Sequence, residues 1–318
     1  MTQIITVTVN PAIDVSTSVS KIAPFSKLRC APAHQDPGGG GINVARVVHR
    51  LGGDVTAIYP AGGASGQLLC GLIDRERVES IAILASEETR QDFTIFEEAT
   101  NQQYRFVMPG ASLSGAEWQE CIGRLVGSRL RPAYVVASGS LPPGVPEDFF
   151  ARVARAAKEM GAKAIVDTSG LPLKAALKEG VYLIKPNLRE FQELAKIKSS
   201  DDVALIEAGR SLIEQGFVEI IALSLGPRGA LLIARELALC ADGLPIKPAS
   251  VVGAGDSFLG AMVWSLAQGD SLEAALRYGV AGGSAAMLNP GTELCRLADV
   301  KHLAPSVVVR TVPNSDRI

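Results

Sequence analysis

Val251-Val-Gly-Ala-Gly-Asp-Ser-Phe-Leu-Gly260 combines a glycine turn, a carboxylate and the start of an apolar periodic segment. This order predicts a tight turn that opens a helix at Asp256. The first amides of a helix have no partner within it, and the helix dipole adds partial positive charge, so such a turn can bind an anion. Asp256 is then either the N-cap of the helix or a general base beside the anion.

Length and composition predict a soluble, cytoplasmic, enzyme-like protein. The 318 residues are 47% apolar, which is enough for a sizeable core in one large domain or two ordinary ones. The net charge of -2 argues against a general attraction to nucleic acid or to an anionic membrane. The first residues lack a signal-peptide pattern, and no apolar run reaches the length of a membrane span. Five scattered cysteines without a CxxC pair argue against structural zinc.

The chain alternates short apolar strands with amphipathic helices. Strands are expected at Ile4–Val9, Thr56–Tyr59, Tyr134–Ala137 and Ala164–Asp167, with helical segments between most of them. Such alternation is typical of an α/β fold with a mostly parallel sheet. Polar residues and glycines collect after the strands, and the carboxyl edge of an open α/β sheet is where ligands bind.

One region interrupts this alternation. Gln91–Glu97 and Tyr104–Met108 alternate apolar and polar residues around a short polar connection, which predicts an antiparallel hairpin. Together with Val15–Arg29 the hairpin could form a small separate sheet. That sheet is either a lid over a cleft or an ordinary edge of the main sheet.

A second glycine loop, Pro37–Asn43, also leads directly into an apolar helical segment. It is either a linker or a place where the backbone approaches a ligand closely, and the helix behind it favours the ligand. Asn43 could cap that helix or bind a sugar hydroxyl, and Asp14 could likewise form a turn or bind a hydroxyl. The chain has no GxxxxGK[ST] motif, and GxGxxG fails because Asn43 and Phe258 occupy the last glycine positions.

Several motifs resemble those of the ribokinase-like family of carbohydrate kinases, with nearly collinear spacing over residues 4–303. The family motifs are Gly38–Asn43, Asn187–Glu190 and Gly253–Asp256. Within the family the chain is similar to the branch of bacterial minor-type 6-phosphofructokinases. The segments that carry this finer similarity are Lys27–Cys30, Tyr104–Gly110, Ser138–Gly144, Ser224–Gly229 and Asn289–Cys295.

The resemblance implies a single three-layer α/β/α kinase domain over residues 1–304, a β lid from about 13–34 and 90–108, and a C-terminal tail at 305–318. It implies ATP-dependent phosphorylation of the C1 hydroxyl of fructose 6-phosphate, with Mg²⁺ and K⁺ as cofactors. It also implies a homodimer whose lids pack together. The partners are therefore a sugar phosphate, ATP and a second copy, with neither nucleic acid nor membrane.

The resemblance also assigns roles to individual residues. Asp256 is the catalytic base, supported by Gly253, Ala254 and Gly255. The sugar phosphate is bound by Asp14, Gly39, Gly40, Asn43, Arg90 and Ser140, together with Lys27 and Arg29, which reach across the dimer. ATP is bound by Lys185, Asn187, Ser224, Gly226, Gly229 and Ser284. Glu190 binds Mg²⁺ mostly through water, and a K⁺ loop consists of Ser250, Val252, Ala286, Asn289 and Gly291.

One departure and three alternatives accompany this interpretation. Position 293 is Glu293, where the resemblance implies a basic residue; a backbone contact would survive this exchange, and a side-chain role would not. A fructose 1-phosphate or tagatose 6-phosphate kinase would share most of these motifs. A nucleotide-binding oxidoreductase would need the missing GxGxxG turn. A non-catalytic sugar-phosphate or ATP sensor could use the same fold, although the intact loop around Asp256 speaks against it.

Overall fold

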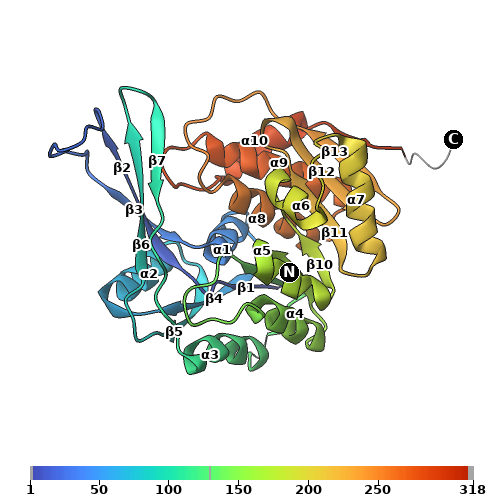
Figure 1. The fold of residues 1–318 in the computed structure, drawn as a ribbon, viewed down its shortest axis with the longest axis horizontal. Helices are drawn as coiled ribbons and strands as arrows, with labels where there is room; N and C mark the ends of the chain where they lie inside the picture. The colour runs from blue at the N-terminus through green and yellow to red at the C-terminus, as the bar shows by residue number, and fades with distance from the viewer. Residues whose placement is uncertain (1–2, 129, 314–318) are drawn as a thin grey trace.

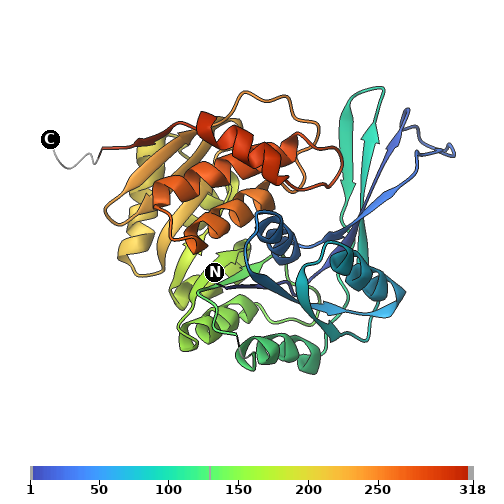
Figure 2. The same ribbon diagram turned by 180° about the vertical axis from the view of Figure 1, so that it is seen from behind.

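A twisted sheet of ten strands forms the centre of the protein, and helices cover both of its faces (Figures 1 and 2). The computed structural model describes residues 3–128 and 130–313. In spatial order the strands are β14 (Val309–Thr311), β13 (Ala238–Asp242), β12 (Gly229–Ala234), β11 (Val218–Ser224), β10 (Val181–Ile184), β9 (Lys163–Asp167), β8 (Tyr134–Ser138), β1 (Ile4–Val7), β4 (Val55–Ala61) and β5 (Glu79–Leu84).

The first strand lies inside the sheet and not at its edge. β1 pairs in parallel with β4 on one side and with β8 on the other. The strands from β5 to β11 in this spatial order are all parallel, and the last three pairings, from β11 to β14, are antiparallel. The next strands of this sheet along the chain, β4 and β5, lie on one side of β1, whereas β8 and the strands after it lie on the other side. This reversal of strand order creates a crevice at the carboxyl ends of β1 and β8.

Two apolar cores separate the sheet from its helices, since successive residues of each strand point to opposite faces. One core contains residues of α1 (Gly40–Arg50), α2 (Gly63–Arg75), α8 (Ala254–Ala267), α9 (Leu272–Met287) and α10 (Leu297–Leu303). The other contains residues of α3 (Gly115–Val126), α4 (Phe149–Glu159), α5 (Gly170–Lys178), α6 (Leu188–Ala195) and α7 (Asp202–Glu214). The three layers that the sequence predicts are confirmed.

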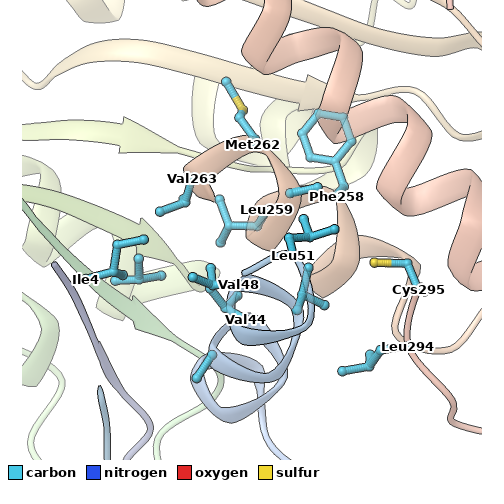
Figure 3. Close-up of a cluster of buried hydrophobic side chains, with 14 of the residues drawn as sticks. Ile4, Val44, Val48, Leu51, Phe258, Leu259, Met262, Val263, Leu294 and Cys295 are labelled. Carbon is cyan, nitrogen blue, oxygen red and sulfur yellow. The ribbon is translucent and has the colours of Figure 1, made fainter. Parts of the chain in front are cut away.

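Helices α1 and α8, which follow the two glycine loops, pack against each other. Figure 3 shows Val44 and Val48 of α1 in one cluster with Leu259 and Val263 of α8. A Cβ atom at Gly260 would lie 2.6 Å from the Cβ of Val47, so the two helices approach closely. This packing places the two glycine loops next to the same crevice.

The small separate sheet that was predicted is present and has four strands in the order β3 (His34–Gly38), β2 (Ala12–Val19), β6 (Arg90–Glu97), β7 (Gln102–Phe106) (Figure 1). Strand β3 was not predicted. We call this sheet the lid. Its register pairs Asp14 with Asp92, and Val15 with Phe93, which in turn faces Phe106. Because side chains alternate between faces, the carboxylates lie on one face and the aromatic rings on the other. The lid therefore has a polar inner face and an apolar outer face.

Several elements differ from the prediction. The short elements α5 and β13 lie in segments where no element was predicted, because neither has a long periodic pattern. Strand β14 pairs with β13, so the sheet extends beyond residue 304, where the predicted domain ends. Helix α2 starts at Gly63, directly after its N-cap Gly62. Within the described part of the chain, no helix combines the length and apolarity that a membrane crossing requires.

Candidate active site

A cavity of about 300 Å³ lies between the lid and the carboxyl ends of β8 and β9. Eight residues predicted to bind substrate or act in catalysis line it, namely Asp14, Gly39, Gly40, Asn43, Arg90, Ser140, Gly253 and Asp256. Val252, predicted for the K⁺ loop, also lines it. The cavity thus brings together residues that are more than 200 positions apart in the sequence, such as Asp14 and Asp256.

The N-cap of α8 is Gly253, so the prediction that the helix opens at Asp256 is wrong. Gly253 has φ 75°, a left-handed conformation that glycine adopts without a steric cost, and this allows the helix to start at Ala254. Asp256 lies in the first turn, and its Oδ2 accepts a hydrogen bond of 2.8 Å from Asn43 Nδ2. Asp256 is therefore not a cap, and its carboxylate faces the cavity.

Burial raises the pKa of Asp256 to about 6, and the negative charge of Asp167 contributes in the same direction. The hydrogen bond from Asn43 and the charges of Lys185 and Arg105 oppose this rise. A carboxylate with a pKa near neutrality accepts a proton more readily than an ordinary aspartate and is still mostly ionised at pH 7. These are the properties of a general base.

Asp14 projects from β2 into the same cavity. Burial raises its pKa to about 6, and the neighbouring carboxylates of Asp92 and Asp256 add to the effect, while Arg105 and Arg46 oppose it. A Cβ atom at Gly38 would lie 2.5 Å from Asp14 Oδ2, so a glycine is needed where β3 passes this carboxylate. Asp14 is held at the cavity wall, where it can accept hydrogen bonds from ligand hydroxyls.

The loop before α1 is packed tightly against the chain. Gly39 is the N-cap, with φ 109°, so the alternative that Asn43 caps the helix is wrong. A Cβ atom at Gly40 would lie 2.3 Å from Ser138 Oγ, and one at Gly41 would lie 2.5 Å from Thr8 Oγ1. The linker alternative is wrong as well, because this loop forms part of the cavity wall.

Two arginines of the lid line the cavity. Arg90 donates hydrogen bonds to the carbonyl oxygens of Pro11 (3.4 Å), Met108 (3.0 Å) and Asn10 (3.3 Å), which fixes its guanidinium at the base of the lid. Arg105 lines the cavity from β7, and its charge acts on both Asp14 and Asp256. The two arginines therefore place positive charge at the lid end of a cavity that Asp14, Asp92, Asp167 and Asp256 also line, and Arg90 lies 3.5 Å from Asp92 Oδ2.

Ser140 also lines the cavity, from the turn after β8, and its hydroxyl oxygen accepts a 2.9 Å hydrogen bond from Asn10 Nδ2. Lys27 and Arg29 do not reach this cavity. Both are exposed in the 20–33 segment of the lid, between β2 and β3. Their predicted contact with a sugar phosphate across a dimer stays a prediction.

Lys185 lies behind the glycine turn of α8. Burial opposes its charge, but the Asp167 and Asp256 carboxylates outweigh this effect, so the pKa of Lys185 is raised. Its Nζ lies 3.3 Å from Asp167 Oδ1, and a Cβ atom at Gly255 would lie 3.3 Å from the same nitrogen. A buried ammonium group thus adds positive charge next to the amides that open α8.

The other predicted ATP residues lie outside this cavity. Asn187 caps α6 in a reciprocal pair with Glu190, whose Oε2 accepts from the Asn187 amide at 2.9 Å. Asn187 also forms a parallel bridge with Ser224, which places the turn at Gly226–Gly229 beside it. Ser284 is buried in α9, next to Gly283, which packs against Ala254. Asn187, Ser224 and this turn form one group at the ends of β10 and β11.

The residues predicted for the K⁺ loop come together in two adjacent segments. Ser250 Oγ donates to the carbonyl oxygen of Gly291 at 2.6 Å and accepts from the Val252 amide at 3.2 Å. The backbone N–H of Asn289 donates to the Ala286 carbonyl oxygen at 3.1 Å. Hydroxyl and carbonyl oxygens suit a hard monovalent cation. Glu293 instead forms an ion pair with Arg296, with 2.8 Å between Oε1 and Nη2.

The fit of Mg²⁺ is different, because in residues 3–128 and 130–313 no cluster of three or more His, Cys, Asp or Glu is placed to hold a metal. Mg²⁺ commonly takes one or two protein carboxylates, with phosphate oxygens and water as its other ligands. Glu190 fits that pattern, since it lies in the group that Asn187 and Ser224 form.

Sequence reasoning missed several residues of the cavity. These are Asp92, Arg105, Val107, Ser138, Gly139, Asp167 and Thr292. Asp167 could have been found, since it ends a predicted strand at the ligand-binding edge. Arg105 depends on the register of the lid hairpin, which decides whether a side chain points inward.

Comparisons with known proteins agree with this geometry. The family model described as pfkB family carbohydrate kinase matches residues 6–299. ATP-dependent 6-phosphofructokinase isozyme 2 of Mycobacterium tuberculosis (strain CDC 1551 / Oshkosh) is 43% identical over 94% of this chain and 88% of its own length. The enzyme of the same name from Escherichia coli (strain K12) is 42% identical over 95% of this chain and 98% of its own length.

Solved structures of phosphofructokinase-2 from Escherichia coli superpose on the model over 96% of this chain and 99% of theirs. The complex with potassium has a TM-score of 0.91 at 41% identity, and the complex with fructose-6-phosphate has a TM-score of 0.90 at 40% identity. The residues matched by the family model include the lid, the cavity and both glycine loops. The chain belongs to the pfkB family of carbohydrate kinases.

Proposed function

We propose that this protein is an ATP-dependent 6-phosphofructokinase, which transfers the γ-phosphoryl group of ATP to the C1 hydroxyl of fructose 6-phosphate. The observation that carries the proposal is the buried Asp256 carboxylate, which faces a cavity lined by arginines at the start of a glycine-capped helix. Two relatives named ATP-dependent 6-phosphofructokinase isozyme 2, at 42–43% identity, support the choice of substrate.

In the proposed reaction Asp256 accepts the proton of the C1 hydroxyl as that oxygen forms a bond to the γ-phosphorus. The bond between the γ-phosphorus and the oxygen of ADP breaks in the same step, with ADP as the leaving group. The amides of Ala254, Gly255 and Asp256 have no partner within α8 and stabilise the charge on the transferred group. The ammonium group of Lys185 adds to this stabilisation.

Asp14 and Asn43 hold the sugar hydroxyls, and Gly39 and Gly40 let the sugar approach the backbone. Arg90, Arg105 and Ser140 surround the sugar phosphate, with Arg105 added because it lines the same wall. A dianion in a partly closed site requires cations, and charge-assisted hydrogen bonds are the strong ones. Lys27 and Arg29 of a second copy complete the phosphate site.

ATP would lie along the group formed by Asn187, Ser224 and the Gly226–Gly229 turn, with Ser284 beside it. Glu190 would hold Mg²⁺ mostly through water, and the ion supplies charge neutralisation on the phosphates when it is bound. Ser250, Val252, Ala286, Asn289 and Gly291 would hold K⁺. The potassium complex of the related Escherichia coli enzyme supports that assignment.

The protein would act as a homodimer joined through the lids. The apolar outer face supports this, because Phe93 and Phe106 are 37% and 47% exposed on neighbouring strands. Such rings are stabilised when a second lid covers them. The proposed enzyme acts in the cytoplasm, since neither phosphorylated substrate crosses a membrane unaided.

The test is a coupled ADP-release assay with ATP and Mg²⁺ over fructose 6-phosphate, fructose 1-phosphate, tagatose 6-phosphate and free fructose. The highest kcat/KM is expected for fructose 6-phosphate. A higher value for fructose 1-phosphate or tagatose 6-phosphate would assign the chain to those kinases instead. No ADP release with any sugar, despite binding of fructose 6-phosphate, would point to a sensor.

A further inference from the structure

Among residues 3–128 and 130–313, Arg46 is the largest side chain that is fully buried, and it lies one helical turn after Asn43 in α1. Residues three or four apart share one face of a helix, so Asn43, Arg46 and Arg50 form a row. A buried arginine must have partners for its charge and its five N–H groups. Its partners decide what the guanidinium does.

Two carboxylates balance the charge of Arg46. Its Nε donates to Glu76 Oε1 at 2.7 Å, and its Nη2 lies 3.2 Å from Asp36 Oδ1 on lid strand β3. Glu76 is the C-cap of α2, where the helix dipole also favours a cation. Asp36 is held in turn by Thr292, whose hydroxyl donates to Asp36 Oδ2 at 2.8 Å.

The remaining nitrogen of Arg46 points toward the active site. Nη1 donates to the Pro37 carbonyl oxygen at 2.7 Å and to Asn43 Oδ1 at 3.2 Å. An arginine has no acceptor, so only the oxygen of the Asn43 amide can face it. The amide nitrogen must then face the other way, where it donates to Asp256 Oδ2 at 2.8 Å.

We infer that Arg46 is a positioning residue for the catalytic base: it fixes the orientation of the Asn43 amide, so that Asn43 always donates a hydrogen bond to Asp256. This inference rests on the proposed role of Asp256 as the base. Without Arg46 the amide could turn over and present its oxygen to the carboxylate. The bond at Oδ2 also leaves Oδ1 of Asp256 to accept the proton of the sugar hydroxyl.

The hydrogen bond has a measurable consequence for pH dependence. It holds the pKa of Asp256 below the value that burial and Asp167 would otherwise impose. The other charged groups that face this carboxylate are Lys185, Arg105 and Asp14. Loss of a hydrogen bond to the ionised form raises a pKa, so the acidic limb of kcat would move to higher pH, by about one pH unit.

The structure offers a matched pair of variants. Arg46→Lys keeps the charge but lacks the planar fork that reaches Asn43, Pro37 and both carboxylates together. Arg50 lies one helical turn further on, and its Nη2 donates to Oε2 of the same Glu76 at 3.0 Å, but Arg50 does not contact Asn43. Arg50→Lys therefore alters an ion pair with Glu76 without touching the amide. Asn43→Ala removes the amide and leaves the ion pairs of Arg46 in place.

The experiment measures kcat from pH 5 to pH 8 for the full-length protein and these variants. Arg46→Lys and Asn43→Ala are expected to move the acidic limb up by about one pH unit, and Arg50→Lys to leave it in place. In the double variant Arg46→Lys/Asn43→Ala the two shifts should not add, because both act through one amide.

Three outcomes would overturn the inference. These are an unmoved limb in folded Arg46→Lys, equal shifts in the Arg46 and Arg50 variants, or additive shifts in the double variant. If Arg46→Lys does not fold, Arg46→Gln is measured in its place with the same outcomes, and an unmoved limb in Asn43→Ala rejects the inference in either case. Failure of the proposed base itself is distinguishable, because kcat of Asp256→Asn would then stay close to that of the unsubstituted protein.

Discussion

The two glycine loops begin alike and differ in their surroundings. Each opens a helix with a glycine N-cap of positive φ, Gly39 at 109° and Gly253 at 75°. In the first loop a Cβ atom at Gly41 would lie 2.5 Å from Thr8 Oγ1 and 2.9 Å from the Val7 carbonyl oxygen. In the second loop a Cβ atom at Gly255 would meet only Lys185, at 3.3 Å from Nζ. Gly253 of the second loop is confined as well, since its Cβ atom would lie 2.7 Å from Leu294 Cδ2. The contrast therefore concerns Gly41, which is needed for packing, and Gly255, which leaves the neighbouring amides open to a ligand.

Each loop lies beside one aspartate, so the chemical roles of the two carboxylates can also be compared. Asp14 lies against Gly38 of the first loop, and Asp256 lies within the helix that the second loop opens. Both are buried, and burial raises the pKa of both to about 6. Only Asp256 lies beside the amides that would face the transferred phosphoryl group, so the two carboxylates are expected to have different roles.

The largest expected effect is that of Asp256→Asn. Because a positioned base contributes about 10²–10⁴-fold, kcat should fall by that factor while the Kd for fructose 6-phosphate stays near its original value. Asp14→Asn, the matched variant at the first loop, should mainly raise KM. Steady-state kinetics and calorimetric titration measure both. Equal losses of kcat in the two variants would remove the distinction between the carboxylates.

The next effect is on stability as a function of pH. Asp14 and Asp256 have a pKa of about 6 in the folded protein and 3.8 in the unfolded chain, so the folded state binds their protons more tightly. The free energy of unfolding should therefore rise as the pH falls from 7 to 5, by about 1–3 kcal/mol.

Urea unfolding at several pH values measures this rise. The double variant Asp14→Asn/Asp256→Asn should lose it. A rise that persists in the double variant would come from other groups. The measurements stay above pH 5 because the pKa of Glu117 is lowered to about 2, so protonation of this carboxylate at lower pH decreases the free energy of unfolding.

Gly41→Ala tests the packing of the first loop. The added methyl group would meet the Val7 carbonyl oxygen, a backbone atom that cannot move without disturbing β1. Overpacking of this kind typically costs about 1–3 kcal/mol, so the free energy of unfolding should fall by that amount. Denaturant unfolding measures it, and an unchanged midpoint would mean that the loop has room to shift.

How far the sequence predicts the site depends on which residues act locally. Gly39, Gly253 and Asp256 belong to motifs that are continuous in sequence, and all three were expected at the cavity. Asp256 was also expected as a possible N-cap, because the sequence does not reveal that Gly253 takes a left-handed conformation and caps the helix three residues earlier. Arg105 depends on the register of the lid.

The same distinction explains the fold. The long parallel strands and their helices follow from local periodicity, and the structure confirms them. β14 forms only because β13 offers it an edge, and such a partner is distant in sequence. Arg46 is another case, since its partners come from β3, from α1 and from the C-cap of α2.

The smallest expected effect is that of Gly255→Ala, which tests whether the second loop is open. Gly255 has an ordinary helical conformation, and alanine in a helix is favoured over glycine by about 0.5–1 kcal/mol, so stability should stay constant or rise. The methyl group would, however, occupy space where a phosphate approaches the amides of α8, so kcat/KM for ATP should fall. Thermal unfolding and steady-state kinetics measure the two quantities on one preparation. A loss of stability similar to that of Gly41→Ala would mean that both loops need glycine for packing alone, and the contrast between them would disappear.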